Sequence, residues 1–336
     1  MTKVNLLLHP SFENQYASSP VVLVDVGAAG GISSRWLRIR KYLQVIGFEP
    51  NTPSFDKLAS ATEKYHDLYL HTALYSEQSS RDFYILKRQN KSSLLQPNSE
   101  LLDKYSRPER AQVVETKQIQ VDTLDRQLET IKVSDVDFIK IDIQGAEYYA
   151  LQGAKKILAS SVCGLEVEVS FGERYTGQPL FSEIELLLRG VGFELIDLRT
   201  FYWKRKIGEH LGGPKGQLMV ANALFFRSPE RLLADSVLYG TREAQRAKIL
   251  RTITVALVYG CADFAAGIFD FHKNYFSKDE TDTILNSLEN WKESKQTIQS
   301  KARRKLSDVF FALYKALESP FGGKLRKTSP LGNPLP

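Results

Sequence analysis

The sequence predicts a doubly wound α/β fold, in which helices cover both faces of a mostly parallel sheet. Strand-like apolar runs alternate with helical patterns along the first two-thirds of the chain. The first run, Val21–Val26, lacks polar alternation, which is typical of a strand buried on both faces. A glycine-rich turn follows it directly. Alternating strand and helix units of this size imply parallel strands joined by right-handed crossovers.

The predicted elements follow one another in a regular order as far as residue 228. Strands are expected over residues 21–26, 44–49, 68–73, 81–86 (as an antiparallel or edge strand), 116–121, 136–143, 164–171, 193–198 and 217–227. Helices are expected over residues 33–42, 54–65, 123–128, 146–158 and 181–190. The polar stretch 87–110 is typical of an excursion or a lid.

The pattern changes after residue 228, where only helical patterns remain, over residues 249–257, 282–291 and 306–317. We therefore expect an α/β domain over residues 1–228, a helical extension over 229–320 and a mobile basic tail over 321–336. The most apolar stretch, residues 252–269, carries Asp263 and predicts a buried helix rather than a transmembrane segment.

The composition is that of a soluble globular protein, with 336 residues, 43% hydrophobic and 25% charged. A net charge of +6 is a mild excess, so no nucleic-acid partner is expected. Two cysteines without a secretory signal favour the reducing cytoplasm. The five histidines show no ligand spacing, so no metal site is predicted. A basic run over residues 301–327 is interpreted as a solvated helix face, with binding to a phosphate-rich or membrane surface as the alternative.

Acidic residues at two strand ends point to the kind of ligand that the turn binds. The turn reads Asp25-x-Gly27-x-x-x-Gly31, and glycines there let the backbone approach a ligand closely. Asp25 would repel a pyrophosphate but would suit an ammonium group. Glu49, about twenty residues downstream, is placed to accept both hydroxyls of a ribose. Together they predict an adenosine-bearing cofactor with a cationic tail.

Candidate catalytic residues lie on two later strands. Asp142 ends a central strand, where open α/β sheets bind ligands, and is the first choice for a general base, with a structural turn cap as the alternative. Glu147 is either catalytic or an acid favoured by the helix dipole. Glu168 shares a strand face with Glu166 and is a secondary candidate. Weaker candidates for acceptor contacts are the polar loop residues Ser92, Ser93, Glu173, Arg174 and Tyr175. Segment 201–206 is interpreted as a solvated loop, with saccharide or anion binding as the alternative.

Three motifs carry a family resemblance: residues 25–34 (DVGAAGGISS), 47–51 (GFEPN) and 137–147 (DFIKIDIQGAE). Residues 121–125 and 221–227 add to it. In their order over residues 20–228, these motifs resemble the FkbM family of methyltransferases. The resemblance implies a Rossmann-like class I fold with an antiparallel last strand, S-adenosylmethionine as the cofactor, and methyl transfer to a hydroxyl oxygen.

By motif position, the resemblance also implies which residues contact the cofactor. The methionine end would lie on Asp25, Gly27, Ala28 and Gly31, the ribose on Glu49 beside Pro50, and the adenine near Ala73 and Leu74, with Asp142 adjoining the site. This chain departs from the family pattern at three positions. Ala29 stands where Asn is common, Gln144 where Glu is common and Asn222 where Asp is common. We expect a looser cofactor turn at Ala29, and roles that the family's acids have at residues 144 and 222 do not transfer.

We therefore expect an O-methyltransferase that acts on a hydroxyl of a sugar, a glycan or a small metabolite, as in polysaccharide modification. The alternatives are N-methylation, a non-catalytic scaffold that binds S-adenosylmethionine, and a nicotinamide oxidoreductase, which Asp25 and the glycine pattern disfavour. The expected partner is a small-molecule or glycan acceptor, and a homo-oligomer formed through the helical extension stays open.

Overall fold

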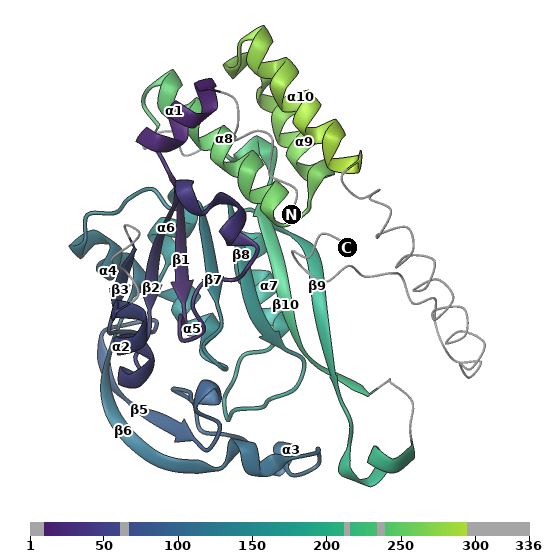
Figure 1. Ribbon diagram of the computed structural model, residues 1–336. Helices are drawn as coiled ribbons and strands as arrows, with labels where there is room; N and C mark the ends of the chain where they lie inside the picture. The colour runs from purple at the N-terminus through teal and green to yellow at the C-terminus, as the bar shows by residue number, and fades with distance from the viewer. Residues whose placement is uncertain (1–9, 61–66, 212–215, 234–238, 294–336) are drawn as a thin grey trace.

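A computed structural model describes residues 10–60, 67–211, 216–233 and 239–293. Its centre is a seven-stranded sheet in the order β3-β2-β1-β7-β8-β10-β9 (Figure 1). The strands are β1 (Val21–Val26), β2 (Leu43–Phe48), β3 (Leu68–Leu70), β7 (Phe138–Ile141), β8 (Gly164–Ser170), β9 (Phe193–Trp203) and β10 (Gln217–Arg227). The first five in the sheet are parallel, and β10 is antiparallel to both β8 and β9. The predicted fold class, antiparallel last strand included, is confirmed.

Helices cover both faces of this sheet, and each face has its own hydrophobic core. One core includes residues of α1 (Pro10–Ser18), η2 (Trp36–Tyr42), α8 (Arg242–Val258), α9 (Ala262–His272) and α10 (Lys278–Glu293). The other includes residues of α4 (Leu124–Thr130), α5 (Glu147–Gln152), α6 (Lys155–Ser160) and α7 (Phe181–Gly190). Successive side chains of a strand point to opposite faces of the sheet, so neighbouring residues belong to different cores. Leu23 and Phe138 lie in the first core, and Val24 and Ile139 lie in the second.

A second, three-stranded sheet lies beyond the carboxyl ends of β1 and β2 (Figure 1). It contains β4 (Ala73–Leu74), β5 (Ser79–Leu86) and β6 (Val113–Asp122) in the order β4-β6-β5. The strand expected over residues 68–73 is therefore divided, because a tight turn, with Thr72 N donating to Leu70 O at 2.9 Å, sends the chain from one sheet to the other. The predicted excursion 87–110 holds short helical turns: η4 (Gln89–Lys91), α3 (Ser99–Leu102) and η5 (Pro108–Ala111).

Several predicted elements differ from the observed ones for local reasons. The helix expected over residues 146–158 is two helices, α5 and α6, because the chain bends at Gly153, where a Cβ atom would collide with the Tyr75 carbonyl oxygen. The apolar stretch 252–269 is likewise divided between α8 and α9 at Gly260, whose φ is +82°. The helix expected over residues 33–42 is a 3-10 helix. The remaining elements are α2 (Thr52–Ser60), η6 (Lys206–Leu211), η7 (Pro229–Arg231) and η8 (Lys273–Tyr275).

The described part of the helical extension is packed against the α/β domain. Lys248 of α8 is fully buried and donates to Asp137 Oδ1 at 2.6 Å, to Asp135 Oδ1 at 3.0 Å and to Val136 O at 3.0 Å. Arg251, one turn later, also pairs with both aspartates. These contacts join α8 to the amino end of β7. The boundary expected at residue 228 stays a prediction, and the helix expected over 306–317, the basic run and the tail lie outside the described residues.

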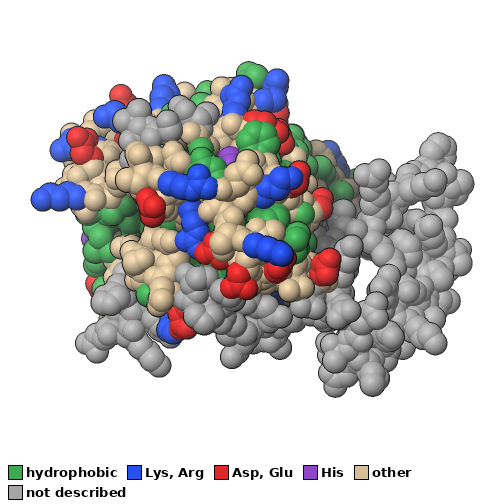
Figure 2. All heavy atoms as spheres, turned by 90° about the horizontal axis from the view of Figure 1, so that it is seen from above, with side chains coloured by type: hydrophobic (Ala, Val, Ile, Leu, Met, Phe, Trp, Pro, Cys, Tyr) green, Lys and Arg blue, Asp and Glu red, His purple; other side chains and the backbone are tan. Residues whose placement is uncertain are grey.

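Two surface properties bear on possible partners. Lysine, arginine and acidic side chains are interspersed on the face that is viewed from the side of the α1 and α8–α10 helices (Figure 2). In the described ranges, no helix combines the length and the apolar character that crossing a membrane requires.

Candidate functional site

Two cavities meet at the carboxyl ends of β1 and β7, which is the switch point where the chain connections leave the sheet in opposite directions. The glycine-turn cavity, of about 520 Å³, is bordered by the turn after β1, the end of β2, β4 and residues 89–94. The arginine-lined cavity, of about 560 Å³, lies between β8, the β9–β10 hairpin and residues 86–111. Among the described residues, only Asp142 and Lys91 line both cavities.

The turn after β1 requires glycine at its first position. Gly27 has a φ of +83°, and a Cβ atom there would collide with the carbonyl oxygen of Asp142. Its amide donates to Phe48 O at 3.0 Å, which fixes the turn against the end of β2. Gly31, with a φ of +68°, closes the turn. Both glycines line the glycine-turn cavity.

Asp25 lies behind this wall and is paired within the protein. It is 3% exposed, and its Oδ1 lies 3.0 Å from Nζ of Lys140, its direct partner across the β1–β7 pairing. The same ammonium donates to Gly27 O at 3.2 Å. Burial raises the pKa of Asp25 although Lys140 opposes that shift. Lys140 itself lines the cavity, whereas Asp25 and the 1% exposed Ala28 do not.

Glu49 and β4 form the opposite part of the glycine-turn cavity. Glu49 is 5% exposed and accepts a hydrogen bond from Asn51 N at 2.9 Å, and burial raises its pKa. Pro50 lines the cavity beside it, and Ala73 and Leu74 add apolar surface. The cavity thus combines a carboxylate suited to a diol with apolar walls suited to a flat ring.

Asp142 lies where the two cavities join, at the end of β7. Gln144 Nε2 donates to Asp142 Oδ1 at 2.6 Å and so orients the carboxylate. Burial, with a further contribution from Glu168, raises the pKa of Asp142. Gln144 has a φ of +59°, and its carbonyl oxygen accepts from Ser93 Oγ at 2.7 Å. The turn and the loop at Ser93 therefore fix each other.

Glu147 and Glu168, the other two catalytic candidates, are placed differently. Glu147 is 1% exposed, lines neither cavity and accepts hydrogen bonds from Ile143 N at 3.0 Å and Gly145 N at 2.9 Å, so it holds the turn that carries Asp142. Burial and the neighbouring Glu168 raise the pKa of Glu147 to about 7.

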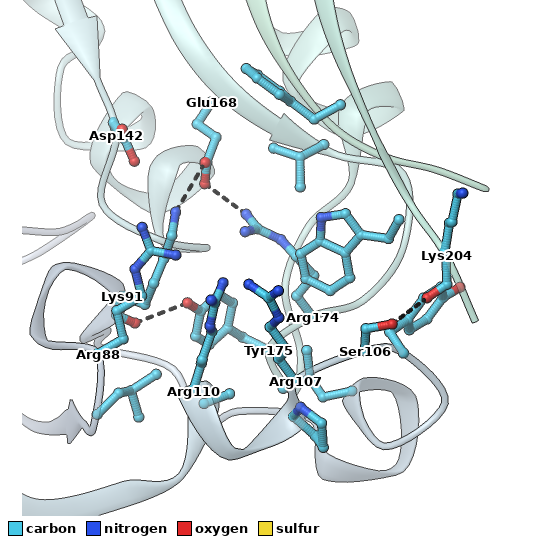
Figure 3. Close-up of a pocket in the computed structure, with 18 of the residues that line it drawn as sticks. Arg88, Lys91, Ser106, Arg107, Arg110, Asp142, Glu168, Arg174, Tyr175 and Lys204 are labelled. Atoms are coloured by element: carbon cyan, nitrogen blue, oxygen red, sulfur yellow. Dashed lines mark hydrogen bonds and ion pairs between the residues drawn. The ribbon is translucent and has the colours of Figure 1, made fainter. Parts of the chain in front are cut away.

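Glu168 faces the arginine-lined cavity, as Figure 3 shows. It accepts from Arg174 Nη2 at 2.7 Å and lies 3.7 Å from Lys91 Nζ. Burial opposes its ionisation, but these cations hold the pKa of Glu168 below its usual value. Oxygen atoms of Asp142, Glu147 and Glu168 lie within 4.8 Å of one another, a spacing at which carboxylates can hold a metal ion. In this structure Arg174 and Lys91 both pair with Glu168, one member of that trio.

Several residues that shape the site carried only weak signals in the sequence. Lys140 is a lone charge in an apolar strand, two positions before Asp142, and that spacing placed both on one face. Lys91, Arg88, Arg107 and Arg110 belong to a polar loop with no motif. Trp203 and Lys204 reach the arginine-lined cavity because β9 extends to residue 203, five residues beyond the predicted strand.

The sequence was compared with family models and with curated proteins. The family model of the methyltransferase FkbM domain matches residues 25–195, just over half of the chain. No curated protein matches the sequence significantly.

Solved structures of methyltransferases are similar to the chain. One is an FkbM methyltransferase from Methylobacillus flagellatus KT, with 14% identity and a TM-score of 0.35 over 62% of this chain. The match spans only 43% of that protein. Another is the magnesium protoporphyrin IX methyltransferase from Synechocystis PCC 6803 with bound S-adenosylmethionine, with 9% identity and a TM-score of 0.33 over 67% of this chain and 80% of that one.

Proposed function

The chain belongs to the FkbM methyltransferase family, and from that premise we propose that it is an O-methyltransferase whose acceptor is a hydroxyl of a sugar, a glycan or a small metabolite. S-adenosylmethionine is the cofactor. The observation that carries the proposal is the position of Asp142, which lines the glycine-turn cavity and the arginine-lined cavity at once. A group at that junction lies beside both a methyl donor in one cavity and an acceptor in the other.

The glycine-turn cavity fits the cofactor in shape and in chemistry. Glu49 would hold the ribose hydroxyls, with Pro50 beside it, and Ala73 and Leu74 would contact the adenine. The methionine end would lie along Gly27 and Gly31, which line this cavity. Because Lys140 lines the cavity, its ammonium would be the cation that meets the methionine carboxylate. Asp25 pairs with Lys140, so it would reach the methionine ammonium only by sharing Lys140 or by displacing it. Ala28 would act through the backbone of the turn.

The chain's own residues would position the acceptor and remove its proton. The bound cofactor supplies an electrophilic methyl group on a sulfonium, which is already a good leaving group. Asp142, oriented by Gln144 Nε2, would accept the proton of the acceptor hydroxyl as the new C–O bond forms. The raised pKa of Asp142 makes its carboxylate a stronger base. Glu168 and Arg174 would orient the acceptor, and Glu147 would position the turn that carries Asp142.

Cofactor binding and turnover test this proposal separately. We expect S-adenosylhomocysteine, but not NAD, to bind in a calorimetric titration, and Glu49→Gln to weaken its binding at least tenfold. Glu185→Gln, on the surface of α7, is the matched control and should leave binding unchanged. Absence of saturable binding to the intact chain would remove the methyltransferase function.

Replacement of the proposed base tests the acceptor chemistry. Asp142→Asn should keep the dissociation constant of S-adenosylhomocysteine within about threefold and lower turnover by roughly 10²-fold or more, measured by methyl transfer from radiolabelled S-adenosylmethionine to a panel of hydroxyl and amine acceptors. Unchanged turnover would exclude Asp142 as the base. Transfer to amines alone would replace O-methylation by N-methylation.

A cytoplasmic location belongs to the proposal because Cys163 and Cys261 are both free thiols.

A further inference from the structure

The arginine-lined cavity is strongly basic for a cavity that would hold a neutral acceptor. Its lining includes six basic side chains, Arg88, Lys91, Arg107, Arg110, Arg174 and Lys204, and two acidic ones, Asp142 and Glu168. The buried Glu168 pairs with Arg174 and Lys91 inside the protein. Asp142 is the one other acid among the described residues of the lining, so basic side chains outnumber acidic ones there by six to two.

Three of these arginines are free to bind a ligand. Within the described ranges, Arg88, Arg107 and Arg110 form no ion pair, and the one side-chain hydrogen bond of the three joins Arg88 Nε to Asn90 Oδ1 at 3.0 Å. All three are exposed at the mouth of the cavity. Figure 3 shows their side chains rising from the loops below toward Glu168 and Arg174. Guanidinium groups that converge without carboxylate partners are suited to an anion with several oxygen atoms.

The opposite part of the cavity suits a polar ring. Asp142 and Glu168 lie together across the cavity from Arg107 and Arg110 (Figure 3). Trp203, which is partly buried, and Phe201, which is exposed, line the wall from β9 and supply apolar ring surface. A ring of that kind stacks against sugar faces, while the carboxylates are placed to contact hydroxyls.

We propose that the methyl acceptor carries an anionic group, a phosphate or a carboxylate, which Arg88, Arg107 and Arg110 bind while the reacting hydroxyl lies at Asp142. This inference rests on the proposed function, because it assigns the substrate class of the same site. Binding of the anion at the mouth of the cavity fixes one end of the acceptor. The hydroxyl at the other end is then held near Asp142, which converts the transfer into a reaction between positioned groups.

Calorimetric titrations of the full chain, saturated with S-adenosylhomocysteine, test this inference. The probes are inorganic phosphate, glucose 1-phosphate, glucuronate and glucose, each at low and at high salt. We expect inorganic phosphate to bind and its affinity to fall with salt. Arg107→Ala combined with Arg110→Ala should weaken phosphate binding at least tenfold. Arg107→Lys combined with Arg110→Lys, which keeps both charges, should restore most of the affinity.

The controls separate this inference from the proposed function. Arg189→Gln, which removes a surface arginine of α7 paired with Glu185, should leave phosphate binding unchanged. The wild-type chain should bind S-adenosylhomocysteine, and no variant should change that affinity. Absence of this binding to the wild-type chain would count against the proposed function. Absence of binding of phosphate, glucose 1-phosphate and glucuronate alike to the wild-type chain, or equal binding of these anions by the double alanine variant, would overturn the inference. Tighter binding of glucuronate than of glucose 1-phosphate would identify the anion as a carboxylate, and the reverse as a phosphate.

Discussion

Lys248→Met should lower the stability of the protein, because Lys248 joins α8 to the sheet through buried charges. Lys248 is fully buried, and its ammonium contacts the two carboxylates of Asp135 and Asp137 and the carbonyl oxygen of Val136. Methionine keeps the length and the apolar contacts of the side chain but removes the charge. Asp137, also fully buried, would then be balanced by Arg251 alone.

The expected loss follows from the cost of leaving a buried charge with fewer partners. Breaking a buried ion pair by removing one partner costs about 3–5 kcal/mol. Because Arg251 stays bonded to Asp137, we expect the lower end, about 3 kcal/mol of the free energy of unfolding. Urea-induced unfolding followed by circular dichroism measures this value.

The control for this prediction is an exposed lysine in an ion pair. Lys273→Met removes the ion pair between Lys273, whose side chain is 60% exposed, and Asp270, whose side chain is 79% exposed. This change should lower the free energy of unfolding by less than about 0.5 kcal/mol. The affinity for S-adenosylhomocysteine should be unchanged in both variants, because Asp137 lies at the amino end of β7 and Asp142 at its carboxyl end. A loss below about 1 kcal/mol for Lys248→Met would refute the reasoning that α8 is bound to the sheet through buried charges.

Two further variants probe the turn after β7. The pKa of Glu147 is about 7 in the folded protein against 4.5 when exposed, so its stabilising effect is full below pH 4.5 and is lost as pH rises through 7. Glu147→Gln should abolish up to about 3 kcal/mol of this decline in the free energy of unfolding. Identical pH profiles of stability for the variant and the wild type would contradict this prediction. Gln144→Glu replaces a donor to Asp142 with a carboxylate, which raises the pKa of Asp142 further, so the acid limb of the kcat/KM profile should move up by about one unit with cofactor affinity unchanged. An acid limb at the wild-type position would show that Gln144 does not orient Asp142.

The sequence by itself determined the main sheet and the positions of the strand-end residues. Apolar runs and glycine turns are local signals, since they depend on the period of a strand and on the backbone angles of a few residues. For that reason Gly27, Glu49 and Asp142 could be placed at strand ends before any contact was known, and the structure puts all three on cavity walls. The same local signals misplaced the strand over residues 68–73, because only tertiary packing divides it between two sheets.

Only the tertiary structure decided which side chains meet. The Asp25–Lys140 pair joins residues 115 positions apart and exists because β1 and β7 are neighbours in the sheet. The arginine-lined cavity combines a loop over residues 86–111, which carries no motif, with the hairpin of β9 and β10, whose motif at residues 221–227 does not indicate which loop it faces. Charge pairing acts across a few ångströms of space, whatever the separation along the chain, so its partners emerge only when the strand order brings distant segments together.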